Sequence, residues 1–154
     1  MEIFFKDTPI IISLIIASIV AFIAYQQYKL AKFNTKRDLY ERRLPVYKSV
    51  MQFIAKANIK AILEINDCLL LLNETNEANF LFRKEVKNYV DILYKKGLEL
   101  HKTYDMLEHL REKVDRDEEY KKYCNENYDL IMWFSTQFNE SEKIFSKYLK
   151  IDLN

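Results

Sequence analysis

The sequence predicts an all-α protein, in which one N-terminal transmembrane helix is followed by an antiparallel bundle of about three long helices. Three observations predict this. Residues 8–28 carry no charge and consist mainly of Ile, Leu, Val, Ala and Phe. The 154 residues include one glycine and two prolines, so the residues that form hairpin turns are scarce. Beyond residue 45, apolar residues recur at steps of three and four, as in helices with one buried face.

The uncharged segment has the length of a membrane span. A helix rises about 1.5 Å per residue, so about 20 apolar residues cross a hydrocarbon core about 30 Å thick. The segment is longer than the apolar part of a cleaved signal peptide and lacks a basic start, which favours a retained anchor. We therefore expect an external tail (1–8), a transmembrane helix (9–28), a basic juxtamembrane helix (29–45) and a helical bundle (46–150).

Basic residues are concentrated just after the predicted span. Residues 1–43 hold seven Lys and Arg against four Asp and Glu, whereas residues 44–154 hold 17 against 19. The positive-inside rule therefore predicts a single-pass membrane protein with its N-terminus outside and its C-terminal domain in the cytoplasm. We expect contact with lipid headgroups from the basic cluster Lys29, Lys32, Lys36, Arg37, Arg42 and Arg43. The alternative is that the cluster acts only as the topology signal.

Small residues recur along one face of the predicted span. Ser13, Ala17, Ala21 and Ala24 are spaced by four, four and three residues, which is typical of helix packing inside membranes. They form a candidate membrane packing face through which a homo-oligomer would assemble. The alternative is that alanine and serine are simply ordinary residues of membrane helices.

Pro45 predicts a kink or short break at residues 43–45, because proline lacks the backbone donor and disfavours helix at the preceding residue. The next apolar stripe runs from Val46 to Leu72 and predicts one helix of about seven turns. Residues 69–72 are four consecutive leucines at the end of this helix, and we expect them to be deeply buried. A loop at residues 73–77 follows.

Two more long helices follow that loop. Thr75 or Asn79 is the expected cap of the first, whose apolar stripe runs over residues 82–110. The only glycine, Gly97, lies on this stripe and predicts a close helix crossing, since glycine is unfavourable inside a helix. A charged connection at residues 115–119 leads to the last helix, over residues 120–148, and residues 151–154 are an expected frayed tail.

Few residues suggest chemistry, so we expect no catalytic residue, no bound metal and no cofactor. His101 and His109 are eight residues apart, which does not match helical metal-ligand pairs and predicts solvated surface side chains. Cys68 and Cys124 lack partners at ligand spacing and predict buried thiols in a reducing compartment. The formal net charge of +1 argues against nucleic acid as a partner.

An enzymatic alternative rests on Lys96 and His101. Small helical ribonucleases of the HEPN class carry an Arg followed by His after four to six residues, and the spacing here is similar. Lysine replaces the arginine, however, and it lacks the planar fork that grips phosphate in two places. We rank this reading last.

Two segments resemble a broad group of uncharacterised small bacterial single-pass membrane proteins with a cytoplasmic helical domain. The first segment, residues 26–53, carries the matching residues Leu39, Arg43, Val46 and Tyr47, and the second, residues 79–100, carries Phe80, Leu81, Phe82, Val86, Tyr89 and Ile92. Pro45 departs from the group's pattern. The resemblance implies the architecture of span plus helical domain and indicates no activity.

The function expected from these observations is that of a non-enzymatic, membrane-anchored helical interaction module. It would act at the cytoplasmic face of the membrane by self-association or by binding a partner protein, with membrane lipids as its other contact. The alternative is a membrane-perturbing effector of a bacterial defence or toxin system, triggered through its cytoplasmic domain. An effector is expected to depolarise cells on overexpression, and a scaffold is not.

Overall fold

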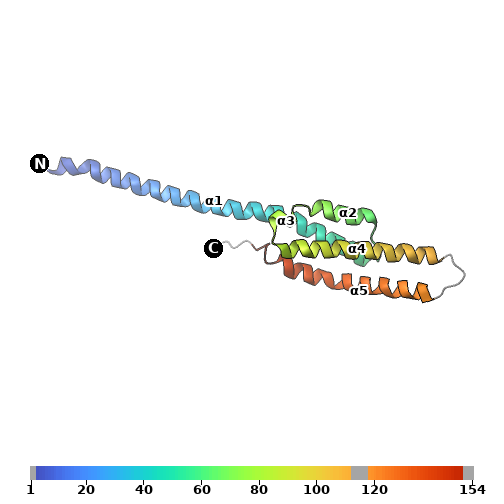
Figure 1. Ribbon diagram of the computed structural model, residues 1–154. Coiled ribbons are helices and arrows are strands. Elements are labelled where there is room, and N and C mark those ends of the chain that lie inside the picture. Colours follow the sequence, from blue (N-terminus) through green and yellow to red (C-terminus); the bar gives the residue numbers. More distant parts are fainter. Residues whose placement is uncertain (1–2, 112–117, 151–154) are drawn as a thin grey trace. The chain divides into compact units, whose positions relative to one another are not determined.

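The computed structural model describes residues 3–111 and 118–150, and side chains from residue 10 on. Five helices make up this range: α1 (Ile3–Lys60), α2 (Ile65–Glu74), α3 (Ala78–Leu81), α4 (Lys84–Arg111) and α5 (Glu118–Phe145) (Figure 1). No strand occurs in the part of the chain that is described, so the all-α prediction is confirmed there. The chain divides into two compact units, one ending at Asp38 and the other running from Leu39 to Lys150.

The first unit consists of the N-terminal part of α1. Every side chain from Ile10 to Asp38 is exposed, including large apolar ones such as Ile10 and Phe22. Exposure of so much apolar surface to water is unfavourable, and such a surface normally contacts a membrane or another protein. By its length and composition, this helix is able to cross a membrane.

The predicted break at residues 43–45 is wrong, because α1 continues through Pro45 to Lys60. Proline removes one backbone donor from the helix, which leaves one carbonyl in the preceding turn without its usual partner. Pro45 lies on an exposed side of α1, where water can solvate that carbonyl. The next residue, Val46, is buried, as is Val50 one turn further along the same helix, and this packing favours an uninterrupted helix.

The predicted single helix over residues 46–72 is also wrong, because the chain turns between α1 and α2. Ala61 has φ 54°, the left-handed conformation that normally favours glycine, and its N–H donates to the Ala57 carbonyl at 3.0 Å. The turn carries α2 back so that Cys68 and Leu71 become buried. The sequence near Ala61 contains no residue typical of a helix end, so tertiary packing determines that α1 ends here.

Two further expectations near α2 are corrected. Of the apolar residues at its end only Leu71 is buried, whereas Leu69, Leu70 and Leu72 are exposed, because α2 is a short amphipathic helix with a single inner face. Thr75 does not cap the following helix. Instead it ends α2, and its hydroxyl donates to the Leu71 carbonyl at 2.6 Å. Asn79 lies inside α3 and does not precede a helix.

The core of Leu39–Lys150 draws on α1, α2, α4 and α5. Aromatic pairs connect elements far apart in sequence: the Phe53 and Phe134 ring centroids are 6.1 Å apart, and those of Phe82 and Phe145 are 5.3 Å apart. The largest side chains with almost no exposure are Phe134, Phe145, Ile54, Leu63, Leu71, Leu93 and Leu100.

Gly97 lies where α4 meets α1 and α2, so the predicted close crossing is confirmed. A Cβ atom at this position would lie 2.6 Å from Phe53 Cζ, 3.1 Å from Cys68 Sγ and 3.3 Å from Leu63 Cδ1. The first distance is shorter than side chains tolerate, and the ring that would have to move is itself buried.

Helices α4 and α5 lie side by side in Figure 1. The Tyr89 hydroxyl donates to the Gln137 carbonyl at 3.2 Å, and the Asn127 amide donates to Thr103 Oγ1 at 3.0 Å. The apolar stripe of α4 is buried as far as Leu100 and only half-buried beyond it. The expectations for residues 115–117 and for the tail at 151–154 fall outside the described residues.

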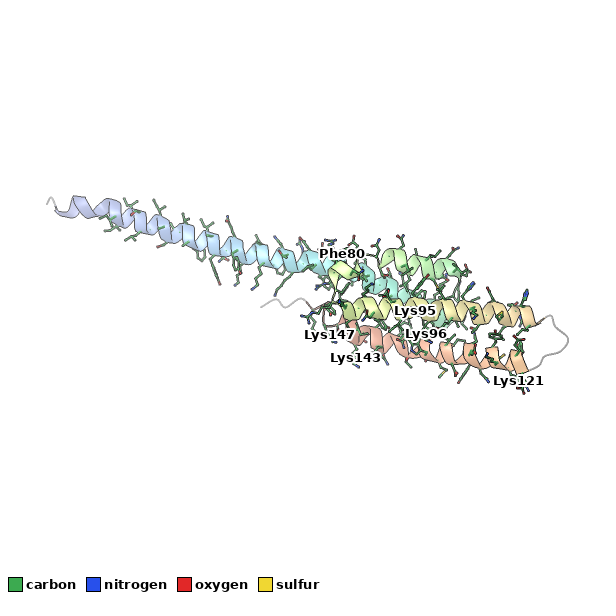
Figure 2. The ribbon with its side chains drawn as sticks, in the orientation of Figure 1. Phe80, Lys95, Lys96, Lys121, Lys143 and Lys147 are labelled. Carbon is green, nitrogen blue, oxygen red and sulfur yellow. The ribbon has the colours of Figure 1, made fainter. Side chains whose placement is uncertain are left out.

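We expect Gly97→Ala to lower the free energy of unfolding by about 1–2 kcal/mol. Overpacking costs about 1–3 kcal/mol, and the better helix propensity of alanine returns up to about 1 kcal/mol. Denaturant unfolding followed by the fluorescence of Trp133, the only tryptophan, measures the change. Lys95→Ala, on the exposed side of the same helix (Figure 2), is the control and should change stability little. An equal or higher stability of Gly97→Ala would contradict the crossing.

Ala61→Gly should raise the free energy of unfolding by about 0.5–1 kcal/mol. Glycine removes the strain of about 1–2 kcal/mol that alanine has at φ 54°. Part of this gain is lost because glycine increases the conformational entropy of the unfolded chain. The same denaturation assay applies. Ala55→Gly, inside α1, should instead lower stability by about 1 kcal/mol, because glycine is unfavourable in a helix. A loss of stability in both variants would show that Ala61 is not strained.

Candidate functional site

The predicted membrane packing face lies on the exposed part of α1. Ser13, Ala17, Ala21 and Ala24 are all exposed, and their spacing places them on one side of the helix. The Ser13 hydroxyl donates to the Ile10 carbonyl at 2.8 Å, so its polar group is satisfied within the helix. The face therefore offers small, nearly apolar surface suited to close packing against another helix.

The basic cluster is divided between the two units. Lys29, Lys32, Lys36 and Arg37 belong to the unit that ends at Asp38, whereas Arg42 and Arg43 belong to Leu39–Lys150. Arg42 Nη2 forms an ion pair with Glu77 Oε2 at 3.0 Å. Arg43 donates to the Leu81 and Tyr148 carbonyls at 2.9 and 3.3 Å. These two arginines thus connect α1 to α3 and to the segment that follows α5. Headgroup contact by the cluster stays a prediction.

His101 is a packing residue, and the expectation of a solvated side chain is wrong for it. Its side chain is 20% exposed, with Nδ1 3.0 Å from the Leu63 carbonyl and Nε2 3.3 Å from Asp105 Oδ2. The carbonyl can only accept, so Nδ1 carries the proton in this contact. The ring thereby ties α4 to the turn between α1 and α2. His109 is exposed as expected.

The side chains of the enzymatic alternative are engaged in such local contacts. Lys96 Nζ lies 2.7 Å from Glu99 Oε2, while His101 contacts Leu63 and Asp105. Within the described range, no group of three or more His, Cys, Asp or Glu side chains is arranged to hold a metal ion.

The two cysteines differ in burial. Cys68 is fully buried, and burial raises the pKa of its thiol to about 11, which keeps it protonated and unreactive at neutral pH. The expectation of a buried thiol is confirmed for this residue. Cys124 is only half-buried, because it lies on α5 beyond the part that the core covers.

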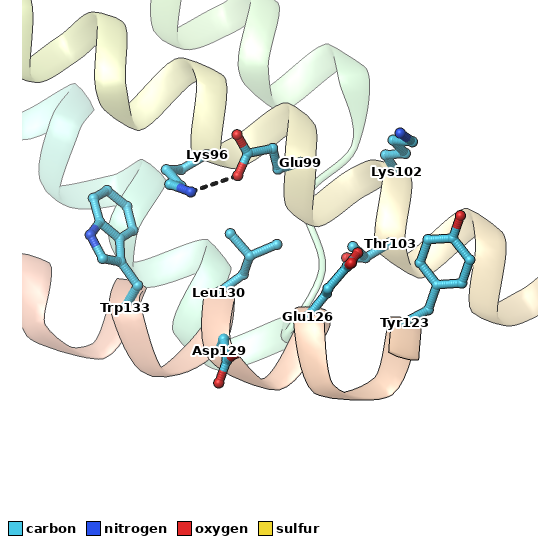
Figure 3. A pocket seen from close by; sticks show the side chains of 9 residues that line it. All are labelled: Lys96, Glu99, Lys102, Thr103, Tyr123, Glu126, Asp129, Leu130 and Trp133. Carbon is cyan, nitrogen blue, oxygen red and sulfur yellow. Dashed lines mark hydrogen bonds and ion pairs between the residues drawn. The ribbon is translucent and has the colours of Figure 1, made fainter. Parts of the chain in front are cut away.

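A cleft of about 460 Å³ lies between α4 and α5 (Figure 3). Figure 3 shows Lys96 turned toward Glu99 on one wall and the indole of Trp133 on the other. The lining combines cations, carboxylates, a hydroxyl and aromatic rings, which suits a small polar ligand. Its residues are Lys96, Glu99, Lys102, Thr103, Tyr123, Glu126, Asp129, Leu130 and Trp133.

A second surface that the sequence reading missed is the outer side of α2. Ile65, Leu69, Leu70 and Leu72 are 36–52% exposed, and together we call them the α2 apolar face. The sequence signal was present in the leucine run. A single helix ending at Leu72 predicts burial of these leucines, whereas the short α2 has one inner face and leaves its other side exposed.

An ion pair fixes the turn before α2. Lys56 Nζ contacts Asp67 Oδ1, and Asp67 Oδ2 accepts the Glu64 N–H at 3.0 Å. Burial of the carboxyl acts to raise the pKa of Asp67, but the hydrogen bonds from Lys56 and Glu64 outweigh it and leave this pKa below its usual 3.8. The hydrogen bond to Asp67 holds the pKa of Lys56 above its usual 10.5, despite partial burial that acts to lower it.

Comparison of the chain with protein-family models, with curated proteins and with solved structures gave no match.

The Asp67 carboxylate should give a stability term that depends on pH. Its folded pKa lies below 3.8, so the stabilisation is present above that pH and is lost as the pH falls through the folded value. Asp67→Asn keeps an acceptor for the Glu64 N–H but removes the charge, and we expect a loss of about 1 kcal/mol near pH 7.

The measurement is denaturant unfolding of both proteins between pH 2 and 7. The difference between them should shrink as the solution becomes more acidic than about pH 4. Asp91→Asn removes the exposed carboxylate of the Lys87–Asp91 pair and is the control, with little expected effect at any pH. A difference that stays constant over the whole range would rule out an electrostatic role for Asp67.

Proposed function

We propose that the chain is a membrane-anchored helical interaction module of a bacterial inner membrane that acts without catalysis. One observation carries the proposal: from Ile10 to Tyr28, α1 is uncharged and every side chain is exposed. In lipid this segment satisfies its backbone within the helix and its side chains by apolar contact. Leu39–Lys150 would then be held at the cytoplasmic face, on the side that the basic cluster favours.

We further propose that Leu39–Lys150 is an antiparallel bundle of three long helices. The hydrogen bonds of Tyr89 with Gln137 and of Asn127 with Thr103 support this, because the partner number rises on α5 as it falls on α4. Such a bundle leaves the α2 apolar face available for contact with a second copy or with a partner protein. The small residues of α1 offer a second contact within the membrane.

The test is the mass of the full-length protein in lipid nanodiscs, compared among paired variants. We expect a defined oligomer, or co-purification of one protein in a fixed ratio. Leu69→Gln with Leu72→Gln should dissociate the assembly if the α2 apolar face carries it. Ala17→Leu with Ala21→Leu should dissociate it if the membrane packing face carries it. Ile92→Gln and Ile19→Leu alter exposed positions away from these two faces and serve as controls.

Two results would overturn the proposal. Extraction of the protein from membranes by alkaline carbonate would contradict the anchor. A monomer that purifies without any partner would contradict the interaction role. Rapid loss of membrane potential on expression, abolished by Ala17→Leu with Ala21→Leu, would instead favour the effector.

A further inference from the structure

A cavity of about 590 Å³ lies within Leu39–Lys150, where α3 leads into α4. We call it the Arg43 pocket. Its lining includes Arg43, Phe80, Arg83, Glu85, Lys147 and Tyr148. Three of these side chains are cationic and one is anionic, so the lining carries a net charge of +2. The α4–α5 cleft, by contrast, has two cationic and three anionic side chains and would repel an anion.

Arg43 is the fixed cation of the pocket. Its guanidinium donates to the Leu81 and Tyr148 carbonyls and lies 5.5 and 5.6 Å from the ring centroids of Phe82 and Tyr148. These contacts use two of its five N–H groups. Within the described part of the chain no carboxylate pairs with it, although the side chain is half-buried. The two carbonyls and the two aromatic rings thus hold the Arg43 guanidinium in one orientation, and its other N–H groups can donate to a ligand.

Arg83 and Lys147 add charge that an anion could recruit. Arg83 is exposed, immediately precedes α4, and forms no ion pair with any described residue. The first backbone N–H groups of α4, a helix of 28 residues, lack partners within the helix and add to the positive potential there. Lys147 Nζ contacts Glu85 Oε1 at 2.9 Å, and both side chains are about half exposed, so this pair can open at small cost.

Phe80 gives the rim of the pocket an apolar surface. It is 88% exposed, the largest value among the exposed large apolar residues, and Figure 2 shows it standing out from the helices. An exposed aromatic ring beside several cations matches a ligand that joins an anionic group to a flat or apolar one. Inorganic anions would not use the ring.

We propose that the Arg43 pocket binds the phosphate group of a phosphate ester, with Arg83 and the spare N–H groups of Arg43 as donors and Phe80 against the organic part. The ester comes either from a soluble nucleotide or from a lipid headgroup, which share this chemistry. The inference goes beyond the proposed function and does not rest on it, because every lining residue belongs to Leu39–Lys150.

The experiment uses the full-length protein and two probes. Calorimetric titration of ADP into protein held in nanodiscs of neutral lipid tests the soluble source. Native mass spectrometry of detergent-solubilised protein with added phosphatidylglycerol tests the lipid source. Arg83→Gln, an exposed change that should not disturb folding, is expected to weaken binding about ten- to a hundredfold, the effect of one charge-assisted hydrogen bond.

Lys143→Gln is the matched control. It removes one charge from an exposed lysine of α5, one turn from Lys147 and outside the pocket lining (Figure 2), and should change binding less than about twofold. Phe80→Ala should weaken the binding of ADP more than that of inorganic pyrophosphate. Binding of ADP that depends on Arg83 assigns a soluble ester, and the same dependence for phosphatidylglycerol alone assigns a headgroup. If neither probe distinguishes Arg83→Gln from Lys143→Gln, the proposal is wrong.

Discussion

The packing of Leu39–Lys150 depends on the missing side chain at Gly97. Without a Cβ atom, α4 approaches α1 and α2 so closely that Phe53, Leu63 and Cys68 meet at one point. From this contact follow the burial of the Cys68 thiol and the position of the Phe53 ring against Phe134 of α5. This short approach therefore sets how closely α4 packs against α1 and α2, and the Phe53 ring extends the same contact to α5.

The sequence carried the class of the fold and the position of this contact, but not the path of the chain around it. The period of the apolar residues and the scarcity of glycine predict long helices, and Gly97 stands out because it is alone on a buried stripe. Pro45 predicts a break that does not occur, because it lies on an exposed side of α1, where the loss of one backbone donor is tolerated. The turn at Ala61 is not marked by a glycine or proline in the sequence. An alanine adopts the left-handed conformation there because the turn allows Cys68 and Leu71 of α2 to pack in the core.

The candidate binding surfaces were harder to predict than the helices. The α2 apolar face looked like core, because its leucines continue the period of the preceding helix. Arg43 looked like one more residue of a basic cluster, whereas it turns toward Phe82 and Tyr148, 39 and 105 positions away in the sequence. The Arg43 pocket brings together three segments that are far apart in the sequence: Arg43, residues 80–85, and Lys147 with Tyr148. Local sequence patterns do not predict a pocket of this kind, because the way the helices cross decides which distant residues come together.

The burial pattern of α4 and α5 also has a consequence for local order. Neither Tyr104–Arg111 nor Glu118–Asp129 contains a buried residue, whereas the adjoining turns are anchored by Thr103 and Leu130. Opening these outer turns exposes little apolar surface, so their amide hydrogens should exchange with solvent through local opening that leaves the core intact. The α4–α5 cleft lies across this boundary. A molecule bound there would join the two helices where local opening begins, and it would also slow exchange in the outer turns that lie beyond its own contacts.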